Sequence, residues 1–217
     1  MTLSSFPNFE FTWRRMTRRS DRDALVRINE FALEAAEALD LPIHFLQLFL
    51  LIEDKRFPVH PGIDIFGMMR AIRFNLIGGR YRQGASTLPQ QLYEIRITTS
   101  GGTYRRTFPT KFRQVLFGVW VSRRLTKIEI VAEYLKTVYW GGAVYGLDDA
   151  AKKIFNKRRN ELSVEESFYL VERLASPNRN SASRLKVMTN RVAIVGLLEQ
   201  AQSSVQTLMS FYEEMKG

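Results

Sequence analysis

Apolar residues recur every three or four positions along much of the chain, which is the spacing of amphipathic helices. Residues 24–39 carry one such stripe, and we expect this helix to begin at an Asp21 or Asp23 cap and to end before Pro42. Residues 43–55 are apolar nearly all round, which predicts a buried helix. The first quarter of the chain is therefore predicted to be helical.

Further helices follow from capping residues and glycine stops. A helix is predicted over residues 64–78, and the last one from about residue 184 to residue 214. Residues 93–99 are the only candidate strand. Three motifs have the spacing of a capping box and should open helices: Thr87-x-x-Gln90, Thr126-x-x-Glu129 and Ser163-x-x-Glu166. The chain is thus predicted to be mostly α.

Composition and charge limit the kinds of site and partner that the chain can have. The 217 residues include no cysteine, which excludes disulfides, thiolate metal sites and a cysteine nucleophile. They include only two histidines. Lys and Arg number 32 against 22 Asp and Glu, a formal net charge of +10. This excess favours an anionic partner: a diphosphate, an acidic membrane surface or a nucleic acid. No recognised nucleic-acid-binding motif is present, so we expect no nucleic acid partner.

The strongest chemical cluster is residues 53–64, directly after the apolar helix. A carboxylate at the end of a buried helix is partly desolvated, which raises its pKa and suits it to act as a general base. Glu53 and Asp54 are the candidates. The alternative is that both pair with neighbouring basic residues, and His60 alone is more typical of a packed structural residue.

Three other clusters fit an anionic or sugar-bearing ligand. Residues 84–91 place a glycine loop before a helix N-terminus, an arrangement that binds anions. A basic stretch follows over residues 105–127, and residues 139–146 combine three glycines with aromatic rings that could stack on sugars. Each has a structural alternative: an ordinary helix start, solvated basic faces, and a glycine-rich turn with core aromatics.

Taken together, these motifs resemble glycosyltransferase family 51, the peptidoglycan glycosyltransferases. Residues 53–62 resemble the family signature Glu-Asp-x-x-Phe-x-x-His-x-Gly. Residues 84–91 resemble its Gly-x-Ser-Thr-x-x-Gln-Gln motif, and residues 127–135 its Lys-x-x-Ile-Leu-x-x-Tyr-Leu-Asn motif. The resemblance covers roughly residues 39–178, with the motifs in the family's order.

The resemblance implies a mostly α fold, with a lysozyme-like helical head and a small membrane-facing jaw lobe. On this basis residues 1–217 are expected to form a single domain. The lobe would comprise about residues 63–84, the catalytic core residues 39–62 and 85–178, and a C-terminal helix residues 179–217.

The resemblance also implies a reaction: transfer or polymerisation of sugars from a polyprenyl-diphosphate-linked glycan, such as lipid II, with inversion. Glu53 would deprotonate the acceptor sugar hydroxyl, which attacks the anomeric carbon as the polyprenyl diphosphate leaves. The residues that would bind substrate or diphosphate are Asp54, His60, Arg70, Ser86, Thr87, Gln90, Gln91, Lys111, Arg113, Gln114 and Lys127.

Two of the departures from the family pattern affect groups that would bind the diphosphate or a metal ion. The third family motif carries a second carboxylate, but Gln114 stands there in this chain, and no Asp or Glu lies between Glu94 and Glu129. Glu94 itself stands near the place of a family lysine. An amide binds Mg²⁺ or Mn²⁺ less well than a carboxylate does. A divalent cation is therefore a possible cofactor, but its binding is expected to be weaker with Gln114 than with a carboxylate at this position. The alternative function is a catalytically impaired relative that binds lipid-linked glycan or a cell-wall assembly partner.

The expected location is peripheral, at the inner membrane, on a face that the sequence leaves open. Residues 45–52 form the longest apolar run, well short of the roughly 20 residues that span a bilayer. The first 22 residues lack the apolar stretch of a signal peptide. The expected partners are the lipid-linked glycan, an anionic membrane surface and a membrane-anchored partner protein.

Overall fold

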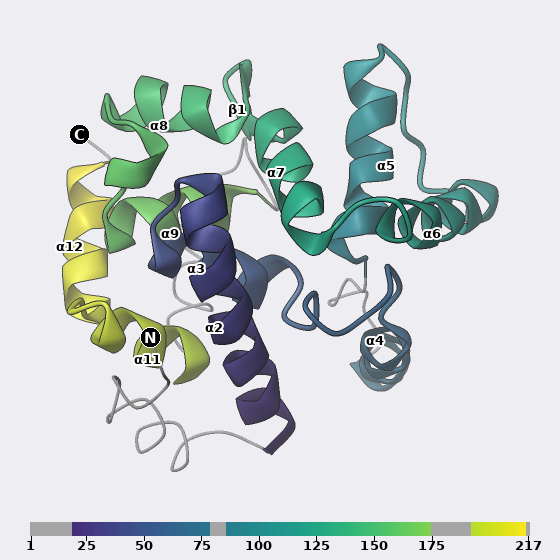
Figure 1. Cartoon of the computed structure of the whole chain (residues 1–217), viewed down its shortest axis with the longest axis horizontal. Coiled ribbons are helices and arrows are strands. Elements are labelled where there is room, and N and C mark those ends of the chain that lie inside the picture. Colours follow the sequence, from purple (N-terminus) through teal and green to yellow (C-terminus); the bar gives the residue numbers. More distant parts are fainter. Residues whose placement is uncertain (1–18, 79–85, 175–191, 216–217) are drawn as a thin grey trace. The chain divides into compact units, whose positions relative to one another are not determined.

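A computed structural model describes residues 19–78, 86–174 and 192–215, and these are mostly helical, as predicted (Figure 1). The elements are α2 (Arg19–Leu39), α3 (Ile43–Glu53), α4 (Ile65–Gly78), α5 (Leu88–Thr99), α6 (Phe108–Ser122), α7 (Lys127–Thr137), β1 (Tyr139–Gly141), β2 (Val144–Tyr145), α8 (Leu147–Phe155), the 3₁₀ helix η2 (Arg159–Glu161), α9 (Val164–Arg173), α11 (Val192–Gln200) and α12 (Val205–Glu214). Part of the predicted lobe, part of the glycine loop and the expected start of the last helix fall in residues 79–85 and 175–191, outside the described residues.

The chain divides into two compact units. One is Glu53–Val138, which we call the site unit because it holds all the predicted site residues. The other, which we call the terminal unit, combines Met1–Ile52 with Tyr139–Gly217.

The core of the terminal unit explains why α3 is apolar on every side. All six residues from Phe45 to Leu50 are buried, as predicted for this helix. Burial of large apolar side chains contributes about 1.5–3 kcal/mol each, so this helix is held by packing rather than by its own propensity. A cluster of core side chains joins α2, α3, α9, α11 and α12: Leu25, Leu48, Val164, Phe168, Tyr169, Ile194, Leu197, Leu198, Leu208 and Tyr212.

Both outer helices of this unit differ from their predictions. The α2 helix already includes Arg19, so the predicted start at an Asp21 or Asp23 cap is wrong. The predicted single last helix is also wrong, because α11 and α12 are separate. Gln202 adopts a left-handed conformation with φ 59°, and the Ser204 side chain accepts the Thr207 N–H to start α12.

The predicted strand over residues 93–99 is wrong, since these residues lie in α5. The β-branched residues that suggested a strand are tolerated because the Thr99 hydroxyl donates to the Ile95 carbonyl at 2.8 Å, within the helix. The strands lie instead at the glycine-rich cluster, where β1 and β2 pair Tyr139 with Tyr145. That cluster is a hairpin turn, with Gly141 and Gly142 at positive φ.

Two of the predicted capping boxes are present. The Thr126 hydroxyl accepts the Glu129 N–H while the Glu129 carboxylate accepts the Thr126 N–H, and Ser163 and Glu166 do the same for α9.

In the site unit, α7 and α6 both pack against α5 (Figure 1). Within the described ranges, no helix has the length and apolar character needed to cross a membrane.

Candidate active site

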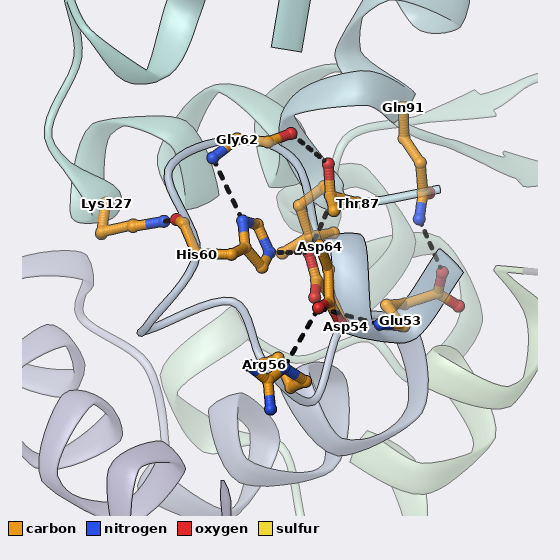
Figure 2. A network of polar contacts seen from close by, with 11 residues as sticks. Glu53, Asp54, Arg56, His60, Gly62, Asp64, Thr87, Gln91 and Lys127 are labelled. Carbon is orange, nitrogen blue, oxygen red and sulfur yellow. Dashed lines mark hydrogen bonds and ion pairs between the residues drawn. The ribbon is translucent and has the colours of Figure 1, made fainter. Parts of the chain in front are cut away.

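Glu53 is the last residue of α3, and its carboxylate is held by α5. Gln91 Nε2 donates to Glu53 Oε2 at 3.3 Å (Figure 2). The Tyr134 hydroxyl on α7 donates to Gln91 Oε1 at 2.9 Å. The Tyr134 bond orients the amide so that its NH₂ group faces the carboxylate. Burial, and then the charges of Glu53 and Glu94, hold the pKa of Tyr134 well above its ordinary value. Tyr134 therefore remains a hydrogen-bond donor, and the half-buried Glu53 carboxylate keeps a fixed direction.

Asp54 and His60 tie together the turn that follows Glu53. His60 Nε2 bonds Asp54 Oδ2 at 2.9 Å, and the Gly62 N–H donates to His60 Nδ1 at 3.1 Å (Figure 2). Because Nδ1 accepts, we assign the imidazole proton to Nε2, which donates to the carboxylate. Both side chains are buried. His60 is thus a neutral structural link in this turn.

The start of α5 is capped by a residue distant in sequence. The Leu88 N–H donates to Asp54 Oδ2 at 2.9 Å, whereas the Thr87 side chain makes no cap hydrogen bond. The Thr87 hydroxyl instead donates to the Gly62 carbonyl at 2.8 Å. The predicted Thr87–Gln90 capping box is therefore wrong, because Asp54 supplies the acceptor. Gln90 is fully buried, and its amide has no partner among the described residues.

Two glycines allow the turn, α5 and α6 to meet closely. Gly62 has φ +99°, and a Cβ built on it would lie 2.2 Å from the Gly118 carbonyl oxygen. A Cβ on Gly118 would lie 2.7 Å from Gln90 Cγ. Only glycine fits at position 62, both for its backbone conformation and for the backbone contact.

Lys127, at the start of α7, braces the same turn. Its ammonium donates to the His60 carbonyl (Figure 2). It lies 4.4 Å from the centre of the Phe57 ring. Burial lowers the pKa of Lys127 to about 8, and the Asp54 charge acts in the opposite direction. Arg56 completes the turn by donating to Asp64 Oδ1 at 3.1 Å. The turn after Glu53 is therefore fixed from several sides.

A separate cationic group lies on α6. Lys111 Nζ donates to Ser86 Oγ at 2.7 Å and to Gln114 Oε1 at 2.8 Å. Gln114 is buried and Lys111 is half-buried. Burial and then the nearby Arg106 charge lower the pKa of Lys111, while Glu94 raises it. Within the described ranges, the ammonium thus contacts two neutral oxygens and no carboxylate.

Two buried carboxylates of the site unit and the amide of Gln114 already bind protein donors. The carboxylate of Asp54 already binds His60 and the Leu88 N–H, and that of Asp64 binds Arg56. At position 114 the oxygen that would face a metal ion accepts from an ammonium instead. Over the described part of the chain, no three His, Cys, Asp or Glu residues gather in a metal-binding group.

The predicted site residues fall into three sets. Glu53 and Gln91 form the first, joined by Tyr134, which the prediction omitted although its motif places it on the α7 face of Lys127 and Ile130. The second is Asp54, His60, Thr87 and Lys127, and the third is Ser86, Lys111 and Gln114. Arg70 and Arg113 are exposed.

Comparisons with known proteins agree on one family. The model of a family described as transglycosylase matches residues 22–201. Penicillin-binding protein 1A of Rickettsia prowazekii (strain Madrid E) is 32% identical over 169 residues, which cover 75% of this chain and 21% of the relative. Penicillin-binding protein 1A of Clostridium perfringens (strain 13 / Type A) is 36% identical over 135 residues, 60% of this chain and 19% of the relative. Penicillin-binding protein 4 of Bacillus subtilis (strain 168) is 34% identical over 130 residues, 60% of this chain and 20% of the relative. The chain thus spans about a fifth of the length of these curated relatives.

Proposed function

Because the chain belongs to the transglycosylase family, glycosyltransferase family 51, we propose that it polymerises glycan strands in peptidoglycan synthesis. Its substrate would be a polyprenyl-diphosphate-linked saccharide such as lipid II. The observation that carries this proposal is the placement of Glu53, a half-buried carboxylate at a helix end whose direction is fixed by Gln91.

Glu53 acts as the general base in this mechanism. It takes the proton of the acceptor sugar hydroxyl, whose oxygen attacks the anomeric carbon of the donor. The bond from that carbon to the diphosphate oxygen breaks, the diphosphate leaves with the electron pair, and the configuration inverts. Gln91 and Tyr134 hold the carboxylate in place, which lowers the barrier by removing orientational freedom.

Lys111 stabilises the leaving diphosphate. Negative charge grows on the diphosphate oxygens as the bond breaks, and a pre-positioned ammonium lowers the energy of that state. The exposed guanidinium groups of Arg70 and Arg113 add positive charge for the donor. Asp54, His60, Thr87 and Lys127 use their polar groups inside the protein, so we assign them to positioning the turn after Glu53 rather than to substrate contact.

The lipid part of such a substrate requires access to a membrane, and the site unit exposes apolar side chains suited to it. Along α6 they recur every four residues, and the Arg124 guanidinium lies 4.7 Å from the centre of the Trp120 ring. Exposed apolar groups beside arginines favour an anionic bilayer surface. The exposed apolar residues of α4 and α6 are Ile65, Phe66, Met69, Phe108, Phe112, Leu116 and Trp120. We assign the protein to the surface of the inner membrane, beside a membrane-anchored partner protein.

The proposal is tested by polymerisation of labelled lipid II in detergent. We expect polymer from the wild type and none from Glu53→Gln, which removes the base and keeps the side-chain shape. Glu37→Gln, an exposed change on α2, is the matched control and should polymerise as the wild type does. Turnover near the wild-type rate in Glu53→Gln would remove Glu53 from the mechanism.

Gln114 favours a second candidate function, a catalytically impaired relative that binds the lipid-linked glycan. The position of the second family carboxylate holds an amide bonded to Lys111. Vesicle co-sedimentation with and without lipid II separates the two functions. Retention that depends on lipid II, without any polymer from the wild type, would support binding alone.

A further inference from the structure

We infer that the ammonium group of Lys111 takes the place of a divalent cation in this site, so that the chain binds a diphosphate without a metal ion. This inference deepens the proposed function and rests on it for the identity of the diphosphate.

The first step is the count of donors on Lys111. An ammonium carries three N–H groups. Two of them donate to Ser86 Oγ and Gln114 Oε1, which fix the position of the nitrogen. The third has no acceptor among the residues that the structure describes and is left for a ligand. Because both acceptors are neutral, neither of them cancels the positive charge of Lys111.

The second step is the identity of residue 114. It lies one helical turn after Lys111 on α6, and its oxygen is 2.8 Å from Nζ. A carboxylate there would form an ion pair with Lys111 and would compete with a phosphate for the same ammonium. The amide fixes the lysine equally well without that competition, so Gln114 makes Lys111 a stronger anion site.

The third step is the electrostatic environment of Lys111 and Gln114. Burial, and then the charge of Arg106, act against the protonated form of Lys111, while the charge of Glu94 favours it. A bound anion relieves both effects, because it restores an interaction for the desolvated charge and offsets Arg106. A divalent cation would do the opposite, since it would add positive charge beside two basic side chains.

The experiment is calorimetric binding of inorganic pyrophosphate to the full chain in buffer that contains EDTA. We expect the wild type to bind, and added Mg²⁺ or Mn²⁺ in place of EDTA not to tighten binding. Lys111→Met should weaken binding about tenfold or more, because it removes the charge and keeps the length of the side chain. Lys136→Met, an exposed change on α7, is the matched control and should bind as the wild type does.

Two substitutions at the buried position 114 separate charge from packing. Gln114→Glu should weaken pyrophosphate binding about tenfold, because the new carboxylate pairs with Lys111. Gln114→Met removes the oxygen without adding charge and should bind within about threefold of the wild type. Unfolding curves for both variants confirm that they fold.

Several results would overturn the inference. They are wild-type binding that requires Mg²⁺ or Mn²⁺, no pyrophosphate binding in either buffer, or equal affinity of Gln114→Glu and the wild type in EDTA. A lipid II assay run in EDTA keeps this inference apart from the proposed function. Metal-free pyrophosphate binding without polymer would contradict the polymerase function alone, whereas polymerisation that stops in EDTA would contradict the metal-free site alone.

Discussion

His60 donates a hydrogen bond of 2.9 Å to Asp54, and both side chains are buried in the turn that follows the candidate base. The same Asp54 oxygen accepts the first N–H of α5. One carboxylate therefore links the imidazole, the turn and the helix that carries Gln91, which is the basis for assigning Asp54 to positioning in the proposed mechanism.

Asp54→Asn should lower the free energy of unfolding by about 2 kcal/mol, because the amide is a weaker acceptor and brings a donor to a place where two donors already point. Urea-induced unfolding measures this. Asp149→Asn, at an exposed ion pair on α8, is the matched control and should change stability by less than about 0.5 kcal/mol. Equal stability of Asp54→Asn and the control would show that the network contributes nothing.

Tyr134→Phe should lower kcat about tenfold and leave KM nearly unchanged, because it releases Gln91, which orients Glu53, and leaves the substrate contacts in place. Lipid II turnover measures this. The substitution removes only a hydroxyl, so the helix packing is kept. Tyr93→Phe, on α5, serves as the control. A rise in KM at constant kcat would instead assign Tyr134 to substrate binding.

Gly62→Ala should destabilise the chain by more than about 3 kcal/mol, because its Cβ would meet the Gly118 carbonyl oxygen, which cannot move independently of α6. Gly101→Ala is a close control, since Gly101 also has positive φ, at +77°, but has nothing within 4 Å of its built Cβ. We expect that change to cost about 1 kcal/mol, from the backbone conformation alone. Similar losses in urea unfolding would mean that the close contact is not the cause.

Lys127 should make stability depend on pH in the alkaline range. Its pKa is about 8 in the folded chain and near 10.5 when unfolded, so between these values the unfolded state binds more protons. The free energy of unfolding of the wild type should therefore rise relative to Lys127→Met from pH 8 to pH 10.5, and their difference should be constant below pH 7. Among the described residues, the Asp54 carboxylate and the His60 carbonyl act on its ammonium. A difference independent of pH from 7 to 10.5 would show that Lys127 is not desolvated.

Local sequence patterns predicted much of the helical structure. The buried α3 helix followed from its uninterrupted apolar residues, and the starts of α7 and α9 followed from capping boxes that close within four residues. One of the failed predictions, the capping box at the start of α5, failed because a distant residue decides the outcome. Thr87 has the right spacing for a cap, but it is Asp54, far earlier in the sequence, that accepts the N–H of Leu88 at the start of α5.

The sequence motifs also supplied the residues expected in the candidate site, but not the direction in which each side chain points. Motif order gave Glu53 as the expected base and placed Asp54 and Lys127 among the expected substrate contacts. The hydrogen bonds divide them, because Asp54 and Lys127 turn their polar groups to the protein interior. That distinction depends on side-chain direction and burial, which a motif does not encode.

The long-range cap of α5 has a consequence for the order of folding. The bond between Asp54 and the Leu88 N–H joins residues 34 positions apart, so loop-closure entropy must be overcome before it forms. The cap of α7 lies within its own first turn and needs no such closure. The α7 segment can therefore gain helical structure early and by itself. The first turn of α5 is stabilised only after the turn that follows Glu53 packs against it. We therefore expect the placement of the candidate base and the completion of the α5 helix to occur together, late in folding.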